Sequence, residues 1–112
     1  MKKFEAQFFR THGGIEPVRE FLKDLDQPDR KIVGEDIATV EYGWPVGMPT
    51  CGPLGKGLWE VRSNISNKRI VRVIFCIANQ TMLLLHAFVK KTQKTPSADM
   101  NLALTRKKEL EK

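Results

Sequence analysis

The sequence contains little cysteine and no long apolar run. Cys51 and Cys76 are the only two cysteines among 112 residues. They show no Cys-x-x-Cys spacing, so a structural zinc site is not expected. No apolar segment is long enough to cross a bilayer, and residues 1–5 lack the apolar stretch of a signal peptide. We therefore expect a cytoplasmic protein with no metal, no cofactor and no contact with a membrane.

Acidic residues are scarce in the second half of the chain. Residues 1–55 carry seven Lys/Arg and nine Asp/Glu, whereas residues 56–112 carry twelve Lys/Arg and four Asp/Glu. The net charges of the two halves are therefore −2 and +8. Lysine and arginine displace counterions from a phosphate backbone, so this asymmetry indicates a polyanionic partner.

The length and the apolar pattern predict one α+β domain that spans residues 1–112. Apolar residues recur at steps of three and four in two neighbouring segments, and Val/Ile-rich runs alternate later in the chain. Residues 43–57 contain five glycines and three prolines, which predicts a loop. The expected elements are a strand at 3–10, helices at 15–25 and 29–42, strands at 58–66, 69–78 and 82–89, and a helix capped by Ser97.

Basic residues interrupt the predicted sheet. Alternation places Arg62 on the face opposite Trp59 and Val61, and it places Arg72 among apolar neighbours. A two-residue turn at Asn67-Lys68 would set Arg62 opposite Val73, whereas a three-residue turn would bring Arg62 and Arg72 together. The sequence alone leaves both registers open, and it also allows Arg62 to pair with Glu60 or Glu41.

The last predicted strand carries His86 and Phe88 on one side and runs into Lys90, Lys91 and Lys94. Arginine, lysine, histidine and an aromatic ring on one sheet face can bind phosphates, stack a base and stabilise charge on a phosphate without a metal. Each residue also has an ordinary explanation: a structural histidine, a core aromatic or a solvated charge cluster. Neither cysteine has the neighbours of a nucleophile.

Four parts of the chain carry a family resemblance: Leu58-Trp59-Glu60-Val61-Arg62, Arg72-Val73-Ile74-Phe75, the run from Leu84 to Pro96, and Ala103 with Arg106. Together they resemble the phage-derived Gp49-like branch of HigB toxins, within the RelE/ParE superfamily. The order of the predicted elements agrees with that superfamily. The resemblance implies a RelE/ParE-like fold, with an N-terminal strand and a helical hairpin packed on a mostly antiparallel twisted sheet and a C-terminal helix.

The resemblance also implies a function. It indicates a toxin that cuts mRNA in the ribosomal A site through attack by a ribose 2′-hydroxyl, with 16S rRNA contacts, and that is neutralised by a HigA-like helix-turn-helix antitoxin. Arg72, Lys91 and His86 take the catalytic positions. The positions that bind RNA are Arg62, Phe88, Lys90 and Lys94.

Two departures from the family pattern concern proton transfer. RelE-type toxins often carry a tyrosine near the C-terminal segment, but the only tyrosine here is Tyr42. Phe75-Cys76 stands where many relatives have a tyrosine after the strand arginine. Other functions of the same fold or charge are a ParE-like gyrase inhibitor and a non-catalytic RNA-binding phage accessory protein.

Overall fold

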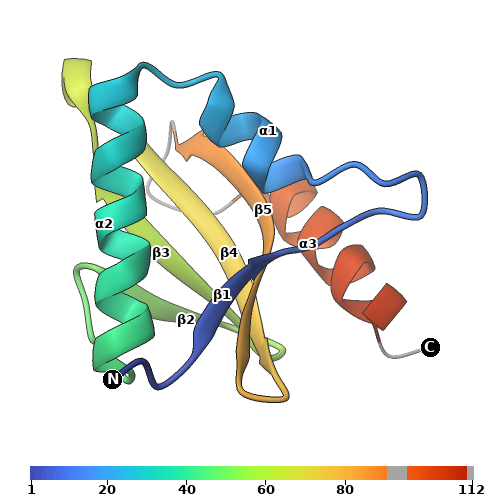
Figure 1. Cartoon of the computed structure of the whole chain (residues 1–112). Coiled ribbons are helices and arrows are strands. Elements are labelled where there is room, and N and C mark those ends of the chain that lie inside the picture. The colour runs from blue at the N-terminus through green and yellow to red at the C-terminus, as the bar shows by residue number, and fades with distance from the viewer. Residues whose placement is uncertain (91–95, 111–112) are drawn as a thin grey trace.

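The computed structural model describes residues 1–90 and 96–110. They form a five-stranded sheet with helices on both of its faces (Figure 1). In chain order, the elements are β1 (Glu5–Phe8), α1 (Pro17–Lys23), α2 (Gln27–Gly43), β2 (Cys51–Gly55), β3 (Leu58–Asn64), β4 (Ile70–Ala78), β5 (Thr81–Lys90) and α3 (Ser97–Leu110).

The sheet has the strand order β1-β5-β4-β3-β2. Strands β2 to β5 form an antiparallel meander, and β1 pairs with β5 in the parallel direction. This arrangement confirms the expected α+β class, with an N-terminal strand, two helices, a mostly antiparallel sheet and a C-terminal helix.

The two faces of the sheet bury two separate cores. Helices α1 and α2 cover one face, where Val18 and Val33 pack with sheet residues such as Val73 and Phe75. Helix α3 covers part of the other face, where Ala103 is fully buried beside residues that include Leu58, Ile74 and Leu85 of the sheet. The period-2 alternation of β3 and β4 therefore places apolar side chains on both faces of the sheet. The face under α3 also carries polar residues.

The predicted loop at 43–57 is partly wrong, because β2 (Cys51–Gly55) lies within it and pairs with β3. A strand that contains Gly52 and Pro53 is tolerated because β2 is an edge strand, where a missing N–H on the outer side costs no ladder hydrogen bond. The β2–β3 turn has positive φ angles at Gly55, Lys56 and Gly57, which explains why two of its residues are glycines.

The turn between β3 and β4 settles the register. The backbone N–H of Ile65 donates to the carbonyl of Arg69, which leaves a loop of three residues, 66–68. Arg62 consequently lies directly opposite Arg72. Of the two registers that the sequence allowed, the structure contains the one that brings the arginines together.

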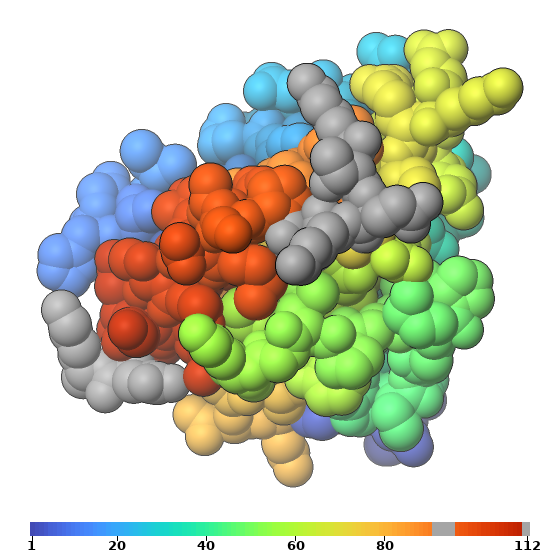
Figure 2. All heavy atoms as spheres, turned by 180° about the vertical axis from the view of Figure 1, so that it is seen from behind, coloured from blue at the N-terminus to red at the C-terminus, as the bar shows by residue number. Residues whose placement is uncertain are grey.

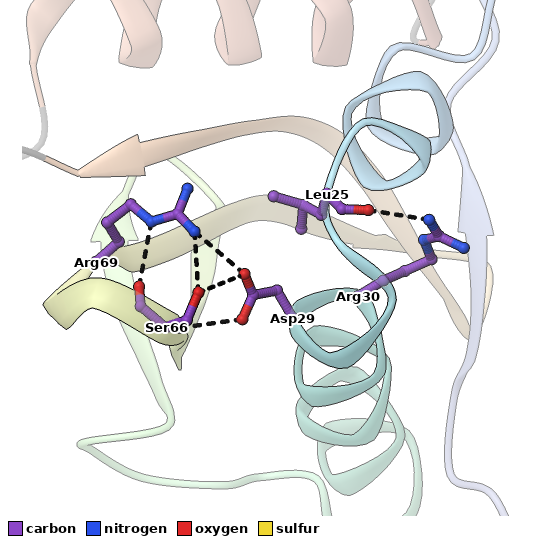
Figure 3. A network of polar contacts seen from close by, with 5 residues as sticks. All are labelled: Leu25, Asp29, Arg30, Ser66 and Arg69. Carbon is purple, nitrogen blue, oxygen red and sulfur yellow. Dashed lines mark hydrogen bonds and ion pairs between the residues drawn. The ribbon is translucent and has the colours of Figure 1, made fainter.

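A buried carboxylate on α2 holds this turn in place (Figure 3). Asp29 accepts hydrogen bonds from the backbone N–H of Ser66 at 3.0 Å, from the Ser66 hydroxyl at 2.8 Å and from the Arg69 guanidinium at 3.1 Å. The hydrogen bonds from Ser66, followed by the charge of Arg69, lower the pKa of Asp29. Near the same end of α2, Arg30 donates to the carbonyls of Leu22 and Leu25 and closes the helical hairpin.

We expect Asp29→Asn to lower the melting temperature by on the order of 5 °C near neutral pH. Because the pKa of Asp29 is lowered in the fold, its contribution is present above the unfolded pKa, about 4, and is lost as the pH falls through the folded value. The difference between wild type and variant should therefore shrink in acid. Thermal unfolding followed by circular dichroism at several pH values measures this difference.

The control is Asp26→Asn, because Asp26 caps the same helix without a side-chain hydrogen bond. A difference that is independent of pH would contradict this role.

Candidate active site

Three neighbouring strands place polar side chains in rows on the face that carries α3. Arg62 of β3 is opposite Arg72 of β4, which is opposite Phe88 of β5. In the next row, Glu60 and His86 flank Ile74. We refer to the surface formed by Glu60, Arg62, Arg72, His86, Phe88 and Lys90 as the arginine surface.

The centre of the arginine surface is a buried ion pair. Nη1 of Arg72 donates to both carboxylate oxygens of Glu60, at 2.5 and 2.6 Å, and each residue is only 3% exposed. The Arg62 Nε donates to Oε1 of the same carboxylate at 3.1 Å, and its side chain is 30% exposed. One carboxylate therefore orients two arginines, of which Arg62 is the more accessible.

Positive charge exceeds negative charge on this surface. Burial lowers the pKa of Lys90, and the nearby charges of Arg72 and Arg62 lower it further, while Glu60 raises it. Lys90 lies two residues after Phe88 on β5, so its side chain leaves the sheet on the same face as those of Arg72 and Phe88. Three cations thus share this face with one carboxylate, so an incoming anion such as a phosphate would be attracted to them.

His86 connects the sheet to α3. Its Nε2 lies 2.6 Å from Oδ1 of Asp99, and its Nδ1 lies 3.4 Å from Nη1 of Arg106, which also donates to the Leu85 carbonyl at 2.8 Å. Since an aspartate only accepts and an arginine only donates, these partners assign the proton of a neutral imidazole to Nε2. The histidine is 15% exposed in its side chain and is held in one orientation from both sides.

Phe88 lies between the charged residues and the core under α3. Its ring stacks on the His86 imidazole, with the centroids 5.6 Å apart and the planes at 20°. It also packs against the buried cluster beneath α3, so it is half-buried. The ring thus has one face occupied by His86.

The structure brings together five of the seven residues selected from the sequence: Arg62, Arg72, His86, Phe88 and Lys90. Lys91 and Lys94 lie outside the described residues. Arg62 does pair with Glu60, whereas Glu41 instead bonds the Ala6 backbone and Lys2.

Sequence reasoning did not identify Glu60 as the partner of Arg72, and it did not identify Asp99 as the partner of His86. The alternation that places Glu60 and Arg62 on one face could have identified Glu60 as a partner of Arg72. Nothing in the sequence pattern indicates the role of Asp99, because that role depends on how α3 lies across β5.

Other candidate groups are distant or unreactive. Tyr42 is exposed at the end of α2, which packs on the opposite face of the sheet, and its ring lies near Lys2. Burial raises the pKa of the Cys51 thiol to about 11, so it carries no thiolate at neutral pH. In the ranges 1–90 and 96–110, no cluster of histidine, cysteine and acidic residues could hold a metal ion.

Comparison with known protein families matches residues 20–108 to the phage-derived protein Gp49-like family (DUF891). The chain belongs to this family. Gp49-like proteins are toxins of the RelE/ParE type, a class that acts with an antitoxin partner. No curated protein matches the chain significantly. Among the described residues of this Gp49-like protein, none of the helices has the length and apolar character needed to cross a bilayer.

We expect Arg72→Ala to destabilise this Gp49-like protein by about 3–5 kcal/mol, because it leaves the Glu60 carboxylate buried with a weaker partner. Arg62→Ala removes the partly exposed partner of the same carboxylate, so it should lower the free energy of unfolding by about 1 kcal/mol or less. Urea unfolding measures both changes. In the double variant Glu60→Gln/Arg72→Ala, the loss should be smaller than the sum of the single losses. Equal effects of the two arginine substitutions would contradict the assignment of Arg72 as the buried partner.

Proposed function

We propose that this protein is a metal-independent endoribonuclease that cuts mRNA on the ribosome and thereby inhibits translation. The observation that supports the proposal is the register of β3 and β4, which sets Arg62 opposite Arg72 so that both pair with the Glu60 carboxylate, on the sheet face that also carries Lys90 of β5. The +8 charge of the second half of the chain agrees with a polyanionic substrate and with contacts to 16S rRNA.

The proposed reaction is an internal transfer at a phosphodiester. The ribose 2′-oxygen attacks the adjacent phosphorus and loses its proton, and the 5′-oxygen of the next nucleotide leaves and gains one. The product is a 2′,3′-cyclic phosphate. Arg72, with Lys91, stabilises the charge that develops on the phosphate. Arg62, Lys90 and Lys94 contact neighbouring phosphates, and Phe88 supplies an apolar surface for a base.

His86 is the proposed proton-transfer residue. Because Asp99 accepts the Nε2 proton, the unprotonated nitrogen is Nδ1, which is the atom that could take the 2′-hydroxyl proton. The shorter hydrogen bond of Arg106 goes to the Leu85 carbonyl rather than to Nδ1, so the guanidinium keeps a partner when Nδ1 takes up a proton. An oriented carboxylate and histidine would thus replace the tyrosine that the chain lacks.

We further propose that the chain acts as one domain in the cytoplasm and that its antitoxin is a HigA-like helix-turn-helix protein encoded beside it. The surplus of positive charge on the arginine surface suits a partner that covers it with acidic groups.

Inducing the protein in cells should stop growth and produce mRNA cuts that depend on translation. Arg62→Gln and Lys90→Gln should each weaken cleavage about tenfold, because each removes one phosphate contact, and both residues lie outside the buried ion pair. The control is Lys31→Gln, which removes the same charge from an exposed residue of α2 on the other side of the sheet. Primer extension on induced cells locates the cuts. Growth arrest with intact mRNA and gyrase-dependent DNA breaks would instead support a ParE-like inhibitor.

Replacing the proposed proton-transfer residue should separate catalysis from binding. We expect His86→Gln to lower the single-turnover cleavage rate about a hundredfold and to leave RNA affinity nearly unchanged. Asp99→Asn should have a smaller effect on the rate. In wild type, ¹⁵N spectra of the imidazole should show the Nε2–H tautomer, and in Asp99→Asn this preference should be lost. A His86→Gln variant with full activity would exclude histidine as the base.

A further inference from the structure

An open pocket lies between the β2–β3 turn and α3. It has a volume of about 550 Å³, and its walls come from two segments, Pro53–Lys56 and the first two turns of α3. In Figure 2 the turn (yellow-green) lies beside α3 (orange to red) on the face that carries the arginine surface. The Lys107 side chain of α3 lies 3.2 Å from the position that a Cβ of Gly57 would take, so the turn and the helix are in close contact.

The pocket continues the arginine surface. Pro53 follows Gly52, which is directly opposite Glu60 in the sheet. On the other wall, Met100 immediately follows Asp99, the partner of His86. Leu54, Met100 and Leu104 of the pocket also pack against the same buried cluster as Phe88 of the arginine surface, so the two regions share one face of the sheet.

Its lining combines apolar walls with a few polar groups. Leu54, Met100 and Leu104 offer flat apolar contact, while Ser97 and Asn101 offer hydrogen-bond donors and acceptors, and Lys56 adds a positive charge. Small-molecule and nucleotide sites have this composition: apolar walls with a small number of orienting polar groups in a volume of about 300–1,000 Å³.

We propose that this pocket binds the base of one nucleotide that neighbours the cleaved phosphodiester. The base would pack between Leu54 and Met100, Asn101 and Ser97 would bond its edge, and Lys56 would contact a phosphate. This inference rests on the proposed function, since it requires an RNA strand across the arginine surface. It adds a subsite that selects the sequence next to the cut.

A nucleotide fits this position better than an apolar partner because of charge and continuity. The pocket opens beside a surface with an excess of cations, and its own charged residue is also a lysine. An RNA strand whose phosphate is bound by Arg62 and Arg72 would place an adjacent nucleotide along the sheet face that carries α3. Positive φ angles at Gly55, Lys56 and Gly57 fix the turn that carries Lys56 at the pocket.

The test uses non-cleavable 2′-O-methyl RNA, a dinucleotide and a trinucleotide, added to the ¹⁵N-labelled full chain. With the trinucleotide, amide signals of Arg62 and Phe88 and those of Gly55, Ser97 and Asn101 should all shift. Shifts confined to the arginine surface would overturn the pocket inference and leave the proposed function intact. The absence of shifts at both places would also overturn the pocket inference, whereas the proposed function is overturned by intact mRNA in induced cells.

Substitutions measure the contribution of the pocket. Asn101→Ala and Lys56→Gln should each weaken trinucleotide binding about threefold to tenfold, since each removes one hydrogen bond or ion contact. Lys31→Gln, which removes the same charge from α2, should change the affinity less than about twofold. Trinucleotides with different terminal bases should bind with different affinity to wild type and with similar affinity to Asn101→Ala. Equal binding by all variants, measured by fluorescence anisotropy, would overturn the assignment.

Discussion

The hydrogen bonds between Asp29 and the β3–β4 turn fix the geometry on which the arginine surface depends. A shift of one residue in that register would leave Arg62 opposite Val73 and separate the two guanidinium groups. The buried carboxylate satisfies the Ser66 backbone and hydroxyl and one Arg69 nitrogen, which stabilises the three-residue turn. A residue on α2, remote from the arginine surface, thus stabilises the register that brings the two arginines together.

The ion pair between Glu60 and Arg72 gives the surface its rigidity. Burial of both charges is tolerated because the carboxylate accepts bonds from two arginines, and the guanidinium is held at both carboxylate oxygens. The desolvation of the two charges costs free energy, but the ion pair holds Arg72 in one orientation. In the proposed reaction Arg72 would therefore not need to reorient when a phosphate binds. Arg62 and Lys90 remain more accessible than Arg72, so in the proposed reaction they would contact the RNA strand while Arg72 would act at the cleaved phosphate.

The sequence was sufficient for features that depend on local pattern and insufficient for those that depend on distant contacts. Alternation identified the faces of Arg62 and Arg72, the apolar spacing identified two helices, and the Ser97 cap identified the third. The edge strand β2 was missed because glycine and proline usually exclude a strand, and only its position at the sheet edge removes that penalty. The β3–β4 register and the role of Asp99 were inaccessible, because each depends on a helix 13 or more residues away in sequence.

The uneven charge of the chain follows from this architecture. The buried acids of the first half stabilise the side of the sheet that α1 and α2 cover. Asp29 holds the β3–β4 turn, and Glu41 accepts a 2.7 Å hydrogen bond from the Ala6 backbone N–H and pairs with Lys2. The second half supplies the strands whose cations point to the other face. Because Asp29 and Glu41 accept backbone hydrogen bonds on the side covered by α1 and α2, these two acids offset little of the positive field on the other side. The same division that stabilises the fold therefore leaves one face positive, which is what a polyanionic substrate requires.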